Sequence, residues 1–297
     1  MQQALIDWND HKLFAVYDSI KLLDPADIPV DIPLGFIRET VDSVKALREL
    51  CSSDNCWTLQ RDSDGIRTLH RHLEDNGVHS IRIEGIVDSP MFDILALLHE
   101  VDLFHTWLPS YAFLGLRSAG IIEEPSPVEL FARIRVAVPW PFSDREVIFR
   151  CVGVDCMGEQ CFNPDETVVS KQIAVLFTSC EHSAAPPSAD CTLASIKPPS
   201  GFLLTPKGEG KTHVVILANI DPQIALVPDW LIDIAVRNLA YLILVAIRKA
   251  ASHVKGEAYQ VRMTDPNNPF FNHIRKRINE SMPEEAKYVV PVRISNS

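Results

Sequence analysis

The sequence places a charged side chain, Arg150, inside an apolar strand pattern predicted from Val147 to Asp155. This strand follows a proline-bracketed tryptophan, Trp140. Because burial of an unpaired charge costs several kcal/mol, Arg150 must either point into water or face a polar group in an interior space. The second alternative indicates a ligand cavity, where a guanidinium group suits a phosphate or a carboxylate.

Other polar side chains occupy strand positions from which they could contact a ligand. Arg133 and Arg135 share one face of the preceding strand, where they either line a hollow or point into solvent. His213 and Asn219 alternate with apolar residues on a strand predicted at 212–220. They either hydrogen-bond the polar head of a ligand or are satisfied within the fold.

Residues that could bind a metal or carry out catalysis do not form a recognisable set. His70 and His72 share one face of a predicted strand, a geometry that a metal ion could use, but a third ligand at suitable spacing is missing. The sequence contains no GxSxG, HExxH or GxxxxGKS/T motif. We therefore predict no metal site, no cofactor and no enzymatic activity.

The composition restricts the classes of partner. The chain of 297 residues carries a formal net charge of -11 and is 46% hydrophobic. An acidic protein lacks the basic surface that replaces counterions on nucleic acid, so we expect no nucleic-acid partner. The seven cysteines form no CxxC pair, and the N-terminus has no secretory signal pattern. Both features favour reduced thiols and a cytoplasmic location.

Hydrophobic periodicity and turn signals predict an α+β fold. A helix at 34–51 precedes three strands, two short helices and six or seven further strands, and a long helix at 228–252 follows. The predicted strands lie at 57–61, 66–73, 79–87, 111–116, 128–138, 147–155, 168–178, 193–196, 202–205 and 212–220. We divide the chain into an N-terminal extension (1–32), a globular domain (33–253) and a C-terminal tail (254–297).

The long helix is apolar on every side from Leu239 to Ile247. An ordinary surface helix has one apolar stripe, so this segment needs a partner on both faces. It is either buried between the sheet and another layer, such as the C-terminal tail, or one face closes a hydrophobic cavity of the size of a lipid. In the second case Trp230, Ile234 and Tyr241 are candidate ligand contacts.

Four local motifs, taken in order, resemble those of the START (steroidogenic acute regulatory-related lipid transfer) domain. They are Phe104–Pro109, Trp140–Val147, Gly201–Pro206 with Lys211–Val215, and Ile220–Pro222 with Val227–Ile232. The resemblance covers roughly residues 33–253. It implies a helix-grip fold, in which a curved antiparallel sheet wraps around a long C-terminal helix. It also implies a tunnel for one sterol, phospholipid, sphingolipid or fatty acid, with that helix and nearby loops as a lid.

The resemblance implies roles for individual residues as well. Arg150 matches an interior arginine that some sterol-binding members keep and pair with an acid, so Arg150→Leu is expected to weaken lipid uptake. This sequence has Phe113 at the position of the acid, so the ligand need not be a sterol. Trp107 belongs to the tryptophan-containing helix end before the fourth strand. We expect all three side chains to contact the ligand.

The tail carries four apolar residues at helical spacing beside basic ones: Phe270, Phe271, Ile274 and Ile278. Such a helix either lies on a membrane surface or docks on the domain or on a second subunit.

The combined prediction is a lipid-binding or lipid-transport protein with a hydrophobic cavity and transient membrane contact. Two alternatives stay open. One is an enzyme on the same scaffold, such as a cyclase or hydrolase of a hydrophobic substrate, and the other is a regulatory interaction module.

Overall fold

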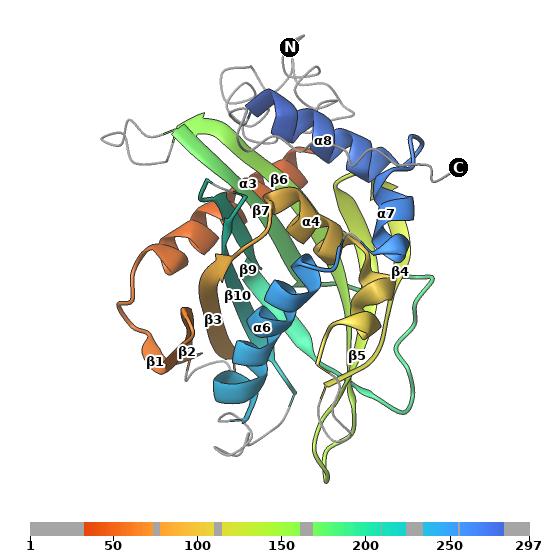
Figure 1. The fold of residues 1–297 in the computed structure, drawn as a ribbon. Coiled ribbons are helices and arrows are strands. Elements are labelled where there is room, and N and C mark those ends of the chain that lie inside the picture. Colours follow the sequence, from red (N-terminus) through yellow and green to blue (C-terminus); the bar gives the residue numbers. More distant parts are fainter. Residues whose placement is uncertain are drawn as a thin grey trace.

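The fold is an antiparallel sheet with helices on both of its faces (Figure 1). The computed structural model describes residues 33–73, 78–109, 115–160, 169–208, 210–223, 234–254 and 256–281. The helices are α3 (Leu34–Ser52), α4 (Met91–His99), the 3-10 helix η2 (Val101–Thr106), the π-helical segment η3 (Ile234–Leu239), α6 (Ala240–Ala251), α7 (Glu257–Met263) and α8 (Pro269–Ser281). The strands are β1 (Thr58–Ser63), β2 (Ile66–Leu73), β3 (Val78–Val87), β4 (Gly115–Ser126), β5 (Glu129–Ala137), β6 (Arg145–Gln160), β7 (Val169–Ser179), β8 (Thr192–Leu193), β9 (Ser195–Pro206) and β10 (Thr212–Asp221).

The strand order is β1-β2-β3-β10-β9-β7-β6-β5-β4, and neighbours along this path are antiparallel. The short strand β8 pairs parallel to β6. The pairing of β3 with β10 joins the first strands of the chain to the last, with Thr212 opposite Val87. Because side chains alternate along a strand, this register produces an inner face under α4 and α6 and an outer face under α3. The predicted α+β class, a curved antiparallel sheet gripping a C-terminal helix, is confirmed.

Each face of the sheet carries its own hydrophobic cluster. On the outer face, α3 buries Ile37, Val41, Val44 and Leu47, each at most 1% exposed. Their spacing of three or four residues is the stripe that predicted the helix. The inner face buries Ile173, Val175, Leu204, Val214 and Ile216 beneath α4 and α6.

Helix α6 is fastened to one edge of the sheet. Arg248 donates hydrogen bonds to the carbonyl oxygens of Asp64 (2.7 Å), Gly65 (3.0 Å) and Ile86 (2.8 Å). Gly85 of β3 allows the close approach, because a Cβ added there would lie only 3.0 Å from a methyl group of Leu244. The position of α6 over β2 and β3 is therefore fixed by the turn between β1 and β2 and by one glycine.

Only one side of α6 is fully covered. Leu244 and Ile247 are 0% exposed, and the helix packs on β2, β3 and α4. Leu242, Ile243 and Val245 on the remaining surface are only half-buried. A helix that is apolar all round thus keeps an apolar side that the protein covers only in part.

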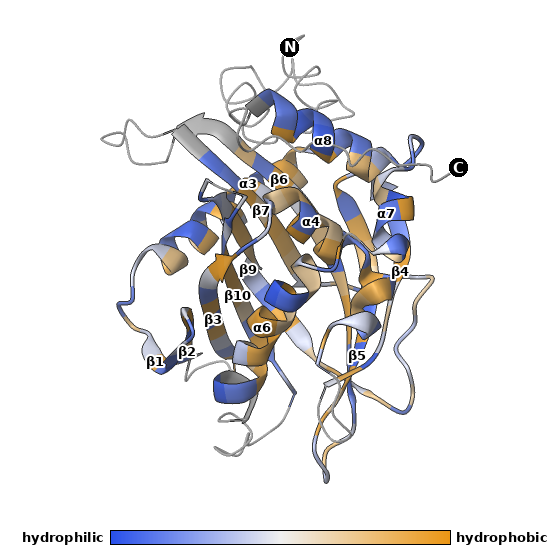
Figure 2. Ribbon diagram, in the orientation of Figure 1, coloured by the Kyte–Doolittle hydropathy of each residue, from blue (hydrophilic) through white to orange (hydrophobic). Residues whose placement is uncertain are grey.

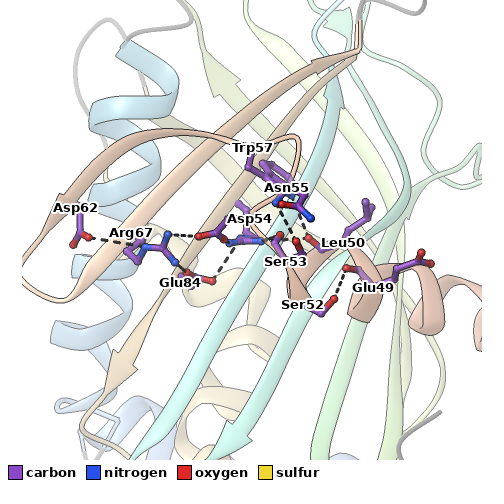
Figure 3. A network of polar contacts seen from close by, with 11 residues as sticks. Glu49, Leu50, Ser52, Ser53, Asp54, Asn55, Trp57, Asp62, Arg67 and Glu84 are labelled. Atoms are coloured by element: carbon purple, nitrogen blue, oxygen red, sulfur yellow. Dashed lines mark hydrogen bonds and ion pairs between the residues drawn. The ribbon is translucent and has the colours of Figure 1, made fainter. Parts of the chain in front are cut away.

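A buried arginine joins the end of α3 to the sheet. Arg82 of β3 is 1% exposed and donates to the carbonyl oxygen of Ser53 (2.8 Å) and to the carboxylate of Asp54. Arg67 bridges Asp54 and Glu84 (Figure 3), at 2.5 Å from each. Hydrogen bonds from Arg67 and then from Arg82 hold the pKa of Asp54 below its usual value. This network attaches α3 to β2 and β3.

The described part of the tail folds back onto the inner-face cluster. Phe271 of α8 is 0% exposed, and the ring of Phe270 stacks on His99 of α4 with 3.7 Å between ring centroids. Arg277 of α8 pairs with Asp155 of β6 at 2.5 Å. For residues 256–281, docking on the domain is therefore confirmed over lying on a membrane.

Helix α7 adds an ion-pair cluster to this docking. Arg262 pairs with Asp102 at 2.7 Å and with the buried carboxylate of Glu100. Burial raises the pKa of Glu100, but hydrogen bonds from His99 and Arg262 outweigh it, so the net pKa lies below the usual value. None of the described helices is long and apolar enough to cross a bilayer.

The docking of α8 makes a direct prediction for stability. Phe271→Ala should lower the free energy of unfolding by about 3–5 kcal/mol, because it removes a fully buried aromatic ring and leaves a cavity. Urea unfolding followed by circular dichroism measures this. Val261→Ala on α7, where the side chain is 51% exposed, is the matched control and should change stability by less than about 0.5 kcal/mol. Equal effects of the two changes would contradict the docking.

Candidate functional site

The part of the inner face that lies away from α6 carries an apolar row. It crosses three neighbouring strands, because Ala119 of β4 pairs with Ile134 of β5, and Ile134 pairs with Val147 of β6. All three side chains are half-buried, as is Ile121 beside them. We call these four residues the apolar wall. In Figure 2 the middle of α6 also carries the hydrophobic colour.

Trp107 packs against two groups of buried residues, the inner-face cluster beneath α4 and α6 and a second cluster on β4 to β6 that also contacts the apolar wall. Its ring meets the ring of Phe104 edge-on, with 5.2 Å between centroids. The side chain is half-buried. Among the predicted ligand contacts that the structure describes, Trp107 is the one that packs on the same buried cluster as the wall residues.

A small cavity lies at the α8 end of the inner face, between α4, α8 and strands β5 to β7. Its volume is about 60 Å³. Apolar side chains such as Leu98, Val175 and Ile274 line it, together with the charged residues Asp155 and Arg277. Ligand pockets for drug-sized molecules measure roughly 300–1,000 Å³, so this cavity takes only a small part of a lipid.

The interior arginine of this structure is Arg145, which the sequence reasoning did not select. Arg145 is 6% exposed and shares the inner face with Val147 and Phe149, because it lies two and four residues before them on β6. Its Nε donates to the carbonyl oxygen of Pro222 (2.7 Å), and its Nη1 donates to that of Ser143 (2.5 Å). Arg145 thus ends the wall just before the segment that leads to α6.

The charge of Arg145 is not balanced by a carboxylate among the residues that the structure describes. Burial lowers its pKa, although a guanidinium group keeps its proton near neutral pH. A buried cation held by neutral oxygen atoms is the arrangement that an anionic ligand would complete.

Arg150 lies on the outer face, so the prediction that it faces an interior cavity is wrong. Its Nε and Nη2 both contact Glu129 Oε1 at 2.6 Å, and its guanidinium group lies 4.1 Å from the ring centroid of Phe36 on α3. Val152, which shares its face of the strand, packs in the α3 cluster. The charge is therefore satisfied by an acid on the neighbouring strand.

Arg133 and Arg135 also lie on the outer face, and the alternative that they line the hollow is wrong. Arg133 donates to the carbonyl oxygen of Pro186 at 2.6 Å. Arg135 pairs with Asp144 (3.2 Å) and with Asp190 (2.9 Å). These contacts hold the loop after β7 against the outside of β5.

His213 and Asn219 share the outer face of β10 with Val215 and Leu217, which pack against α3, so neither lies on the inner face. Asn219 accepts a hydrogen bond from Ser80 Oγ (2.6 Å), and its backbone N–H donates to Ser200 Oγ (2.9 Å). Asn219 therefore has its hydrogen-bond partners within the fold, which is the second of the two alternatives that the sequence left open. Burial, and then the charge of Lys207, lower the pKa of His213.

Tyr241 anchors α6 to the turn between β1 and β2. Its hydroxyl donates to Asp64 Oδ2 at 2.5 Å, and the guanidinium group of Arg61 lies 3.5 Å from its ring centroid. The hydroxyl group of Tyr241 therefore already has a hydrogen-bond partner within the protein. The predicted contacts Phe113 and Trp230 and the side chain of Ile234 lie outside the described residues.

The family of the chain follows from comparison with known proteins. A family model of the START domain matches residues 38–255, and the chain belongs to this family. A search of curated protein sequences finds no match.

Solved structures share the fold at low sequence identity. Human STARD10 has a TM-score of 0.61 at 17% identity, with 86% of this chain and 90% of that chain covered. Human StAR-related lipid transfer protein 5 has a TM-score of 0.59 at 16% identity, with 74% and 97% covered. A STAR-related lipid transfer protein fragment from Xanthomonas axonopodis has a TM-score of 0.52 at 18% identity, with 67% and 99% covered. At these identities the likeness establishes the helix-grip architecture alone.

Proposed function

We propose that this START-domain protein binds one lipid between the apolar wall and α6, and carries or senses it. Membership of the family supports lipid binding in general. The observation that carries the proposal is the half-buried apolar wall on the inner face, together with the half-buried side of α6. Apolar surface left in water costs about 25 cal/mol per Å², so a hydrocarbon chain placed there is stabilised by removing both surfaces from water.

The ligand that this site suits best has an anionic head group. Arg145 lies on the same face as the wall and supplies a buried guanidinium group without a described acidic partner. A phosphate or a carboxylate can accept hydrogen bonds from it. A phospholipid or a fatty acid therefore fits the site better than a sterol, whose hydroxyl carries no charge.

The binding unit in this proposal is residues 33–253, preceded by the extension 1–32. Helices α7 and α8, which belong to the tail at 254–297, add buried side chains to the inner-face cluster beside α4. The wall residues carry no groups that exchange protons, and arginine is not deprotonated in proteins. These features support binding without catalysis, and the protein is proposed to act in the cytoplasm.

Contact with a membrane is proposed to occur through the loop between β5 and β6. Trp140 in this loop is 90% exposed, and Leu193 on β8 is 41% exposed. The strand that follows the loop pairs with β8, with Arg145 opposite Thr192. Tryptophan favours the boundary between water and lipid, so an exposed tryptophan five residues from the head-group arginine suits transient membrane contact.

Filling the space beside the wall tests the binding site. Ile134→Trp should lower uptake of a fluorescent lipid from vesicles at least roughly tenfold, because the indole ring occupies the volume of the chain, while stability changes by no more than about 1–3 kcal/mol. The control Ile86→Trp introduces the same side chain at an exposed position of β3 and should leave uptake unchanged. Normal uptake by a folded Ile134→Trp variant would show that lipid does not bind beside the apolar wall.

Replacing the two arginines of β6 separates the inner from the outer face. Arg145→Met should weaken binding of a fatty acid or phosphatidic acid roughly 10- to 100-fold, because a charge-assisted hydrogen bond is lost, and Arg145→Lys should recover part of it. Binding of a neutral diacylglycerol should change much less. Arg150→Met should leave all three affinities unchanged. A loss of anionic lipid with Arg150→Met instead would reverse the assignment.

The exposed tryptophan has a test in vesicle binding. Trp140→Ala should reduce sedimentation with phosphatidylcholine vesicles by roughly tenfold, because one inserted aromatic ring is removed, with no change in the thermal midpoint. Leu59→Ala, which removes a 50% exposed apolar side chain from β1, serves as the control and should bind vesicles as the parent does. Equal binding by all three proteins would show that the loop between β5 and β6 is not the membrane contact.

A further inference from the structure

A cavity of about 520 Å³ lies on the outer face of the sheet, between α3 and strands β6, β7 and β9. This volume falls within the range of roughly 300–1,000 Å³ that pockets for small ligands have. Val152 of β6 and Leu176 of β7 give the cavity an apolar floor, since they are paired across the strands and are 7% and 9% exposed. The cavity is separate from the proposed lipid site, which uses the other face of the sheet.

The packing of α3 explains the open space. In the C-terminal half of α3 the helix lies close to β9, where a Cβ added at Gly201 would be only 3.0 Å from a methyl group of Leu47. Before that point, the residues of α3 that line the cavity include three with small side chains, Thr40, Ser43 and Ala46. Small side chains fill little of the space between a helix and a sheet, so room remains above the apolar floor.

A buried hydroxyl group in this cavity lacks a partner. Thr40 is 5% exposed, and its side chain makes no hydrogen bond with any residue that the structure describes. Its oxygen is not sealed off from water either, so the hydroxyl faces the open space that Thr40 lines. Buried polar groups in folded proteins are almost always hydrogen-bonded. This hydroxyl is therefore placed to bond a ligand.

The charge that the cavity presents is negative. Glu39 and Asp42 of α3 line it one turn apart, and both residues are exposed. Neither forms an ion pair within the part of the chain that the structure describes. Arg150 also lines the cavity, but Glu129 neutralises its charge at 2.6 Å. Two carboxylates without partners remain, and such a surface attracts a cation.

We propose that this cavity binds a small organic cation, an amine with an apolar body. The ammonium group lies beside Glu39 and Asp42 and donates a hydrogen bond to the hydroxyl of Thr40. The apolar body covers Val152 and Leu176, which removes apolar surface from water. An organic anion is repelled by the two carboxylates, and a neutral compound gains nothing from them.

Three probes of similar size test the preference for a cation: 2-phenylethylamine, 2-phenylethanol and 3-phenylpropionate. Each is titrated into the full-length protein in a calorimeter at low salt. We expect one amine per chain with a submillimolar Kd, at least roughly fivefold weaker binding of the alcohol, and no binding of the carboxylate. About 0.5 M NaCl should weaken amine binding at least roughly threefold, because it screens both carboxylates. The proposal is overturned if the amine does not bind saturably or if the carboxylate binds as tightly.

Variants locate the binding site on α3. The double change Glu39→Gln with Asp42→Asn should weaken amine binding at least roughly fivefold. Thr40→Val keeps nearly the same shape and should weaken binding roughly three- to tenfold, while the thermal midpoint does not fall because no hydrogen bond within the described fold is lost. Glu49→Gln removes an exposed carboxylate of α3 that does not line the cavity and should have no effect.

The outcome does not depend on lipid binding. Ile134→Trp, which fills the space beside the apolar wall on the other face, should leave the affinity for 2-phenylethylamine unchanged. The proposal is overturned if the folded double variant and the folded Thr40→Val variant bind the amine as tightly as the parent does.

Discussion

One helix cannot cover the inner face of this sheet, and the rest of the account depends on that limit. An α-helix with its side chains is about 10–12 Å across, and neighbouring strands are about 4.8 Å apart, so α6 spans two or three strands. The strand path has nine members. Arg248, Tyr241 and Gly85 hold α6 near β1, β2 and β3. The apolar side chains of β4 to β6 must therefore be covered by something else.

Several elements share that task. Helices α4 and α8 cover the end of the sheet near Asp155, where the ring of Phe270 stacks on His99 and the remaining cavity is small. The 3-10 helix η2 and Trp107 cover the buried floor of β4 to β6. The apolar wall is left half-buried between these covers, with Arg145 at its end. The proposed amphipathic ligand would thus meet an apolar surface and a buried guanidinium group on one face of the sheet.

The sequence predicted most of the elements but few of their faces. The strand predicted at 111–116 overlaps β4 (Gly115–Ser126) only at its end, and the strands predicted at 193–196 and 202–205 belong to the single strand β9 (Ser195–Pro206). The helix at 34–51 and the strand at 66–73 follow from local spacing, and the structure has them at Leu34–Ser52 and Ile66–Leu73. Alternation along β6 separates Arg145 and Arg150 onto opposite faces, but it does not say which face is interior. That is decided by where α3 and α6 pack, through contacts between residues far apart in the chain. Arg150 therefore seemed to need an interior partner, although Glu129 on the neighbouring strand satisfies it.

Long-range pairing also explains the remaining differences. The apolar residues of the tail could be recognised as a helix, but only the fold shows that they meet α4. The fully buried Arg82 depends on carbonyl groups at the end of α3, about thirty residues earlier in the chain, which no strand pattern contains. In each case the residue type was visible and its partner was not.

A crystal structure of the protein purified with its bound ligand tests the central claim most directly. The account predicts continuous elongated density along Ala119, Ile134 and Val147, with its polar end within hydrogen-bond distance of Arg145. It would be contradicted by a hollow filled with the protein's own side chains, from the wall to α6, with no passage for a lipid chain.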